Sequence, residues 1–494
     1  MFRKNLARRD DNVRFCTVLA TTTNRSSIDQ ITADAKIDIL SDEALLEIFS
    51  CYLAEEADSR AHDWRWLTLV HVCRRWRTIV FESPCRLDLR IPCTGRSRVK
   101  EMLDIWPVLP IDVWAAGGIA VSRSGDVDNI VAALKHNDRV RRIWVESAGS
   151  VFSESIATVI QEPLPALTHL HMASWEESVP AVFPETFLGG SAPHLRYLSL
   201  DGIAFPGIQK LLLTANHLVR LQLIYVPLSG YISPEAMATC LSVLPNLERL
   251  SLEFTDFPFP GRLDRHPPPL SRVFLPSLTH FVLTGAIEYI EDLVSRIDAP
   301  LLDHAYITFF GQLAFVTPRL HDFLARTDAF AARSHAAVQF DPGSQVVTFE
   351  LKPGFLLQIK YARAESQLSS IALTCSSSLR PFSTLERLDI CQFDPKEQHW
   401  PVDMENSQWL ELLRPLTALK DLYLGKPEEL ALRIVSALQE LAERGTAEHL
   451  PTLQNVFIEG LQPSGPLQGV IMQFVAARQL SGHPVAVHRW EREP

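Results

Sequence analysis

A six-residue apolar block returns ten times along this 494-residue chain, and it restricts the possible folds more than any other feature. The block reads Leu-x-x-Leu-x-Leu or a close apolar variant, as in Leu195-Arg-Tyr-Leu198-Ser-Leu200. The copies begin at Val140, Leu167, Leu195, Leu218, Leu247, Leu278, Leu302, Leu385, Leu419 and Leu453. A single block cannot bury its own apolar row, so neighbouring copies must stack and share a core. The repetition therefore predicts a solenoid.

The phase of each block predicts a strand with one buried side. Residues two apart in a strand share a face, so Leu170 and Met172 should point inward while His171 points outward. Segments with helical spacing separate the blocks, for example 208–213, 236–244 and 430–441. A strand on one side and a helix on the other side of each repeat predict an α/β solenoid with parallel strands and outer helices.

The spacing of the blocks resembles that of leucine-rich repeats, but it is irregular. Leucine-rich repeats run about 20–29 residues. The blocks that begin at Leu195 and Leu218 are 23 residues apart, and those that begin at Leu385 and Leu419 are 34 residues apart. The fold class is therefore an irregular leucine-rich-repeat solenoid whose later repeats are long.

Two stretches interrupt the series. The interval from Leu302 to Leu385 is long enough for two poorly matching repeats, and within it the alternating runs 338–340 and 346–351 flank an Asp-Pro-Gly turn. That arrangement predicts a β-hairpin. The proline-rich stretch 256–276 predicts a surface loop, since Pro has no N–H for a central strand. A polyproline ligand for another domain is the alternative there.

Composition and charge narrow the class of protein. The net charge is −11, and a nucleic-acid-binding surface needs clustered Lys and Arg, so we expect no nucleic-acid partner. No run approaches the roughly 18 apolar residues of a transmembrane helix, so we expect no membrane partner. The eight Cys are scattered without a Cys-x-x-Cys pair, which predicts reduced thiols and an intracellular, cytoplasmic or nuclear location.

The first 36 residues are rich in Arg, Thr and Ser, and this composition predicts a disordered tail. Their basic residues could also indicate a mitochondrial presequence. Asp10 and Asp11 interrupt that pattern, because presequences are poor in acidic residues. The disordered tail is the better interpretation.

Residues 37–82 differ from the repeats and predict helices. Ser41 is a good N-cap for a first helix. Apolar residues cover an arc of about 200° on that helix, whereas docking on one core needs a stripe of only about 100°. The extra width predicts two apolar contacts, one internal and one with a partner. A second helical run extends from Trp66 to Val80 and stops before Ser83-Pro84.

The two helical runs resemble the F-box. They contain Leu40-Ser-Asp-Glu-Ala-Leu-Leu-Glu-Ile-Phe49 and Leu69-Val-His-Val-Cys-Arg-Arg-Trp76, and the family motif reads Leu-Pro-x-Glu-x-Leu-x-x-Ile-Phe and then Val-Cys-x-x-Trp. Ser41 replaces the usual Pro, and both residues suit a helix start. The stretch 54–65 is longer and more acidic than in most members, and the continuation 81–89 looks like the lead-in to the repeats of fungal F-box proteins.

The resemblance implies a division of the chain and a set of partners. The tail would be residues 1–36, the F-box 37–82 and the leucine-rich-repeat-like solenoid 83–494. The F-box would dock on the Skp adaptor of an SCF-type ubiquitin ligase, and through it on cullin, while the solenoid would bind an unknown substrate protein. The implied adaptor-binding residues are Leu40, Leu45, Leu46, Ile48, Phe49, Leu53, Val72, Cys73 and Trp76.

Outward strand positions are the candidates for substrate binding, because aromatic residues and Arg are enriched at interface hot spots. They are Trp144, Tyr197, Arg220, Arg249, His280, Tyr306, Arg387, Tyr423 and Phe457. We expect Trp144, Tyr197, Tyr306 and Tyr423 to share one phase of the block and therefore one surface on the inside of a horseshoe.

No chemistry is expected of this chain itself. It carries no Gly-x-Ser-x-Gly or His-Glu-x-x-His motif, so we expect no catalytic residue, no metal and no cofactor. Two other functions stay open. The chain could be a leucine-rich-repeat scaffold acting outside a ubiquitin ligase, or residues 37–82 could be no more than a helical cap on the first repeat.

Overall fold

The computed structural model divides the chain into two compact units, Met1–Arg90 and Ile91–Pro494. It describes residues 39–54, 65–95, 98–115, 124–147, 156–174, 180–255, 271–310, 317–331, 333–341, 346–352, 354–360, 384–392, 406–443, 450–462, 464–465 and 467–491. The expected tail at 1–36 lies outside these residues. Among the helices of the described ranges, none has the length and apolar character needed to cross a membrane.

Within residues 39–54 and 65–90 the first unit contains three helices, α2 (Asp42–Ala54), α3 (Arg65–Val70) and α4 (Arg74–Glu82). The predicted N-cap is confirmed, since the Ser41 Oγ accepts a hydrogen bond from the Ala44 N–H at 3.2 Å. The prediction of one second helical run is wrong. The chain turns at 71–73, and Cys73 becomes the N-cap of α4 by accepting a hydrogen bond from the Trp76 N–H at 3.5 Å.

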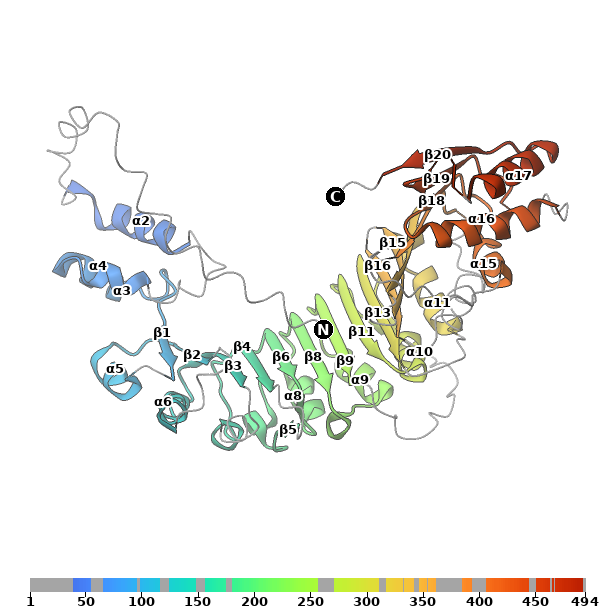
Figure 1. The fold of residues 1–494 in the computed structure, drawn as a ribbon. Helices are drawn as coiled ribbons and strands as arrows, with labels where there is room; N and C mark the ends of the chain where they lie inside the picture. Colours follow the sequence, from blue (N-terminus) through green and yellow to red (C-terminus); the bar gives the residue numbers. More distant parts are fainter. Residues whose placement is uncertain are drawn as a thin grey trace, which may run out of the picture. The chain divides into compact units, whose positions relative to one another are not determined.

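The second unit is built on one sheet of 16 strands, and helices pack along one face of that sheet (Figure 1). In spatial order the strands are β1 (Ile91–Thr94), β2 (Ile111–Ala115), β3 (Val140–Ser147), β4 (His169–Ser174), β6 (Tyr197–Asp201), β8 (Arg220–Val226), β9 (Arg249–Phe254), β11 (His280–Gly285), β13 (His304–Phe310), β16 (Phe355–Lys360), β15 (Val346–Lys352), β14 (His335–Asp341), β17 (Arg387–Gln392), β18 (Asp421–Leu424), β19 (Asn455–Glu459) and β20 (Ala486–Trp490).

The ten predicted blocks each end in a strand of this sheet, and neighbouring block strands pair in parallel. In β6 and β8, for example, Leu198 lies opposite Leu221 and Leu200 lies opposite Leu223. All four of these side chains are buried, because each repeat covers the apolar row of the next. The predicted parallel leucine-rich-repeat-like solenoid is confirmed at this level.

Helices connect the strands and cover the buried face of the sheet (Figure 1). The three segments predicted to be helical correspond to α8 (Ile208–Thr214), α9 (Pro234–Leu241) and α16 (Glu428–Glu443). Further helices in the described part of the chain are α5 (Val99–Ile105), α6 (Ser124–Leu134), α10 (Ile287–Arg296), α11 (Pro318–Ala325), α12 (Asp328–Ala331), α15 (Asn406–Leu413) and α17 (Leu467–Leu480), with 3-10 turns at Phe187–Gly190 and Leu228–Gly230. We use the term strand face for the opposite face of the sheet.

The described residues between Leu302 and Leu385 form an antiparallel insertion where two further repeats could have fitted. The predicted hairpin is present, because β14 and β15 pair antiparallel with Asp341 opposite Val346. A third strand, β16, then pairs antiparallel with β15 and parallel with β13, while β14 pairs parallel with β17. An insertion of three antiparallel strands leaves its two outer strands pointing the same way. The parallel array can therefore continue on both sides of the insertion.

The proline-rich stretch ends in a short strand rather than in a loop. Residues 256–270 lie outside the described residues, but β10 (Val273–Phe274) pairs in parallel with β12 (Ile297–Asp298). A second small sheet joins β5 (Ala181–Val182) to β7 (Ile203–Ala204). Both small sheets lie outside the 16-stranded sheet.

Glu291 is a buried acid that holds the start of α11. Its two carboxylate oxygens accept hydrogen bonds from the backbone N–H groups of Leu320 at 2.8 Å and Arg319 at 3.0 Å. These groups belong to the first turn of α11, where helix N–H groups need outside acceptors. Burial raises the pKa of the Glu291 carboxyl, although both hydrogen bonds oppose that shift.

We expect Glu291→Gln to lower the free energy of unfolding by about 1–3 kcal/mol, because one buried N–H loses its acceptor. Glu411→Gln, at an exposed position of α15, should change it by less than about 0.5 kcal/mol. Urea denaturation of both variants measures the difference. Equal stabilities would show that Glu291 does not cap α11.

Candidate protein-binding surfaces

The nine predicted adaptor-binding residues comprise a buried group of four, an exposed group of four and the half-buried Trp76. Four form the interior of the first unit, namely Leu45, Leu46, Phe49 and Leu53. Trp76 is half-buried and its ring centroid lies 4.7 Å from that of Phe49. Four are exposed, namely Leu40, Ile48, Val72 and Cys73. The broad apolar arc on α2 is thus divided between an inner and an outer side, as its width predicted.

Charged contacts hold the start of α2 against α4. The Arg75 guanidinium donates to the Asp42 carboxylate at 2.6 Å and to the Leu40 carbonyl oxygen at 2.6 Å. Arg86 binds the carboxylates of Glu43, at 2.7 Å, and Glu47. Since Val72 and Cys73 immediately precede α4, these contacts bring them to the end of the unit where Leu40 lies.

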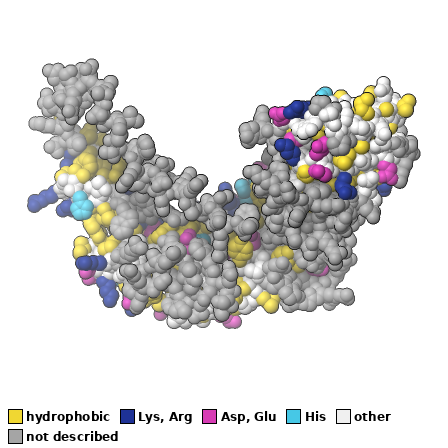
Figure 2. Space-filling model, in the orientation of Figure 1, with side chains coloured by type: hydrophobic (Ala, Val, Ile, Leu, Met, Phe, Trp, Pro, Cys, Tyr) yellow, Lys and Arg dark blue, Asp and Glu magenta, His cyan; other side chains and the backbone are white. Residues whose placement is uncertain are grey.

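The outer side of the first unit therefore combines apolar and basic side chains. Ile48 is 50% exposed and Val72 is 56% exposed, which is high for apolar residues that lie beside a packed core. Figure 2 shows hydrophobic side chains next to Lys and Arg side chains over α2–α4. An exposed apolar group of this kind is typical of an interaction surface.

On the strand face, the register of the sheet separates the predicted substrate-binding residues into two rows. The third-position row comes from the residue just before the second apolar residue of each block, and the fifth-position row from the residue just before the third. Tyr197, Arg220, Arg249, His280 and Arg387 occupy the third-position row. Trp144, Tyr306, Tyr423 and Phe457 occupy the fifth-position row.

The expectation that Tyr197 shares a phase with the other three aromatic residues is wrong. Tyr197 lies opposite His169 and Arg220, whereas Trp144 lies opposite His171, two residues further along β4. Two residues of a strand span about 7 Å. Both rows still lie on the strand face, because the rows differ by one full side-chain alternation.

A first aromatic cluster covers β2 to β6. The Trp114 and Trp144 rings are stacked with centroids 5.2 Å apart, and Trp144 lies 4.0 Å from the His171 ring and 6.4 Å from the Tyr197 ring. Arg220 stacks over Tyr197 at 5.6 Å. Burial lowers the pKa of His171, so its imidazole favours the neutral form. Trp114 was not predicted, because its strand precedes the first recognisable block.

A second aromatic cluster lies beyond the three-stranded insertion. The Tyr423 and Phe457 rings are stacked at 4.3 Å, Trp490 meets Tyr423 at 5.3 Å, and the Arg387 guanidinium lies 3.8 Å from the Tyr423 ring. The predicted residues are therefore not one continuous surface. The insertion β14–β16 stands between Tyr306 on β13 and Tyr423 on β18.

Asp389 connects the insertion to the second cluster. It accepts hydrogen bonds from Arg387 at 2.9 Å and from the His335 Nε2 of β14 at 3.0 Å. Burial alone would raise the pKa of the Asp389 carboxyl, but these two hydrogen bonds outweigh burial and hold the pKa below its ordinary value. The network fixes Arg387 over the Tyr423 ring.

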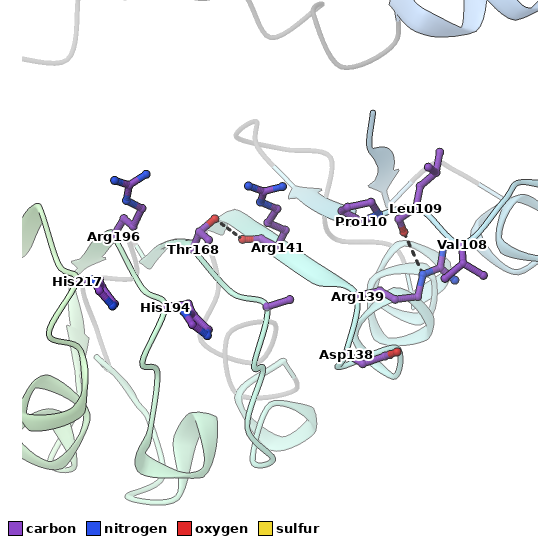
Figure 3. Close-up of a pocket in the computed structure, with 11 residues that line it drawn as sticks. Val108, Leu109, Pro110, Asp138, Arg139, Arg141, Thr168, His194, Arg196 and His217 are labelled. Carbon is purple, nitrogen blue, oxygen red and sulfur yellow. Dashed lines mark hydrogen bonds between the residues drawn. The ribbon is translucent and has the colours of Figure 1, made fainter. Parts of the chain in front are cut away.

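A groove of about 670 Å³ opens at the starts of β2 to β8, and Figure 3 shows its lining. Arg141 and Arg196 project to the same side of the ribbon there (Figure 3). Below them the His194 and His217 rings lie parallel with centroids 6.4 Å apart. Arg139 donates to the Leu109 carbonyl oxygen at 3.0 Å. The sequence pattern does not reveal this basic groove, because most of its lining residues lie in the segments that lead into the strands.

Comparison with known proteins adds little to these observations. No family model matches the chain, and no curated protein matches its sequence. Among solved structures, the leucine-rich repeat-containing protein LegL7 from Legionella pneumophila is similar, with 13% identity over 78% of this chain and 97% of that chain and a TM-score of 0.22. An internalin (InlF) from Listeria monocytogenes is similar with 13% identity over 67% of this chain and 82% of that chain and a TM-score of 0.22. At such TM-scores neither likeness supports an inference, so the leucine-rich-repeat-like fold rests on the blocks and the parallel register.

Proposed function

We propose that this chain is an F-box protein that serves as the substrate-binding subunit of an SCF-type ubiquitin ligase. The observation that carries the proposal is the outer side of the first unit. Leu40, Ile48 and Val72 are exposed there, although Leu45 and Phe49 of α2 already fill the interior. In the F-box motif that residues 40–76 resemble, this surface would dock on the Skp adaptor.

The solenoid would then bind the substrate through its strand face. Leucine-rich-repeat-like solenoids present a long surface for protein binding, and here that surface carries two aromatic clusters. The chain would supply no catalytic group. Its contribution would be to raise the effective concentration of a substrate lysine near the conjugating enzyme and to orient it.

Purification of the full chain with the adaptor and cullin tests the proposal. Recovery of both proteins is the expected result. Recovery of the adaptor without cullin would favour a scaffold that acts outside a ligase. Failure to bind the purified adaptor would contradict the F-box assignment and leave a solenoid with a helical cap.

Loss of two tyrosines from the strand face should leave the solenoid folded but weaken substrate binding. Tyr306 is 39% exposed, and Tyr197 donates to the Gln222 side-chain oxygen at 2.9 Å while it supports Arg220. We expect Tyr197→Ala with Tyr306→Ala to reduce substrate capture at least tenfold, or about 1.4 kcal/mol, with little change in melting temperature.

Quantitative mass spectrometry of the proteins held by the full chain measures this effect. Tyr225→Ala is the matched control, because Tyr225 is exposed near the end of β8 and belongs to neither aromatic cluster. Adaptor binding should persist in both variants. Unchanged capture by the double variant would show that substrate uses the loops or the helical face instead.

A further inference from the structure

Four residues that can carry positive charge lie side by side on the strand face. The register places Arg220 of β8 opposite Arg249 of β9, Arg249 opposite His280 of β11, and His280 opposite His304 of β13. We call these four residues the cationic row. Adjacent strands are about 4.8 Å apart, so the row extends over about 14 Å. Like charges in directly opposite positions destabilise a sheet, which makes the row unusual.

The described residues supply little negative charge to the cationic row. Arg249 is exposed and has no ion pair or side-chain hydrogen bond within them, and Arg220 has only the stacking contact with Tyr197. His304 lies 3.3 Å from the Asp303 carboxylate, but that carboxylate is also bound by Arg333 at 3.1 Å. Arg220 and Arg249 therefore keep their positive charges for another molecule.

The fifth-position neighbours of the row are uncharged, and basic residues adjoin the row at one end. In the fifth-position row the same four strands carry Gln222, Ser251, Val282 and Tyr306. The basic groove adjoins the row on the N-terminal side of the strands. Tyr197 lies opposite Arg220, and Arg196 of the groove immediately precedes Tyr197. Burial first, and then the charges of Arg249 and His304, lower the pKa of His280, as expected in a positive field.

We propose that the cationic row binds an acidic segment of a partner protein, with Asp and Glu carboxylates seated on the guanidinium and imidazole groups. This inference rests on the proposed function, in which the strand face holds the substrate. Arg pairs with carboxylates through two parallel hydrogen bonds. An extended segment repeats its same-face side chains every 7 Å or so, so two or three acidic residues would match the length of the row.

The net charge of the chain favours a short acidic segment over a nucleic acid. The chain has a net charge of −11, so the row is a local region of positive charge in an acidic protein. Glu146 and Glu253 lie further along strands of the same sheet. A long polyphosphate backbone would meet such negative charges, whereas a segment a few residues long can remain on the row.

Fluorescence anisotropy with the full chain and a labelled octaglutamate peptide tests the proposal. We expect the wild-type chain to bind this peptide, to bind it more weakly as salt increases, and not to bind octaglutamine. Arg220→Glu with Arg249→Glu should weaken binding at least tenfold. Arg220→Lys with Arg249→Lys should weaken binding less than the reversal does, because the charge stays and only the paired hydrogen bonds are lost, and this separates lost charge from a damaged fold.

Lys210→Glu with Arg414→Glu is the matched control, because it makes the same change in net charge at exposed sites on α8 and after α15. This control should bind octaglutamate within about twofold of wild type, since the row is intact.

A titration followed by NMR should show the pKa of His280 rising when the peptide binds. Equal losses in the reversal and control variants would overturn the proposal, and so would tighter binding of a single-stranded RNA of equal charge. Adaptor binding should survive in every variant, so failure here is distinguishable from failure of the F-box assignment.

Discussion

In the proposed complex with the Skp adaptor, Ile48→Asp should weaken binding about a hundredfold while both units stay folded. Ile48 is 50% exposed on α2, so the free protein can solvate the new carboxylate. In the complex that carboxylate would be buried without a partner, at a cost of about 3 kcal/mol. Each 1.4 kcal/mol or so is tenfold in affinity. Titration calorimetry with purified adaptor measures the loss.

Leu213→Asp is the matched control for Ile48→Asp. Leu213 is 47% exposed on α8 of the solenoid, so the substitution adds the same charge at similar exposure, outside the first unit. Its adaptor affinity should equal that of the wild type. Wild-type affinity in the Ile48→Asp variant would remove α2 from the docking surface, whatever the solenoid binds.

The sequence predicted the solenoid well because its signal is local and repeated. The ten blocks each end in a strand, and the alternation that buries Leu198 and Leu200 can be read from six residues. The same signal is weak where a strand lacks the block. β1, β2 and β20 were therefore not predicted. β16 was not predicted because a three-stranded insertion is specified by pairing between distant strands.

The candidate surfaces were only partly predictable. Solvent-side positions and their two rows can be read from the blocks. Tyr197 precedes the second apolar residue of its block and Trp144 precedes the third, so their separation was predictable and the shared phase was assigned wrongly. The position of the insertion separated the two aromatic clusters. The insertion is not encoded within one block.

For the N-terminal helices, too, the sequence pattern could not distinguish neighbouring residues. The width of the apolar arc on α2 predicted both an inner and an outer contact. It could not assign neighbours to them, and the structure places Phe49 inside and Ile48 outside. The assignment depends on the packing of α4, where Trp76 meets Phe49. A sequence-based view treats the two residues as equivalent, but their substitutions should act by different mechanisms.

Phe49→Ala should destabilise the first unit by about 3–5 kcal/mol, because it removes a buried ring and leaves a cavity. Phe49 is 1% exposed, and its ring lies 4.7 Å from that of Trp76. A small helical unit has a low free energy of unfolding. We therefore expect the amides of α2 and α4 to lose protection from hydrogen exchange while the solenoid stays folded. Hydrogen exchange of the amides in α2, α4 and β6 measures each part separately.

Ile48→Ala is the control for this effect, since an exposed side chain contributes little to packing and its loss should cost less than about 1 kcal/mol. Phe49→Asp would also abolish adaptor binding, but through unfolding, so that loss alone is no evidence for a docking contact. The pattern that distinguishes the two residues is specific. Ile48→Asp should retain wild-type protection of α2 and lose the adaptor, whereas Phe49→Ala should lose protection first. Wild-type protection of α2 and α4 in the Phe49→Ala variant would contradict the packing of Phe49 against Trp76 and would return Phe49 to the outer surface of the unit.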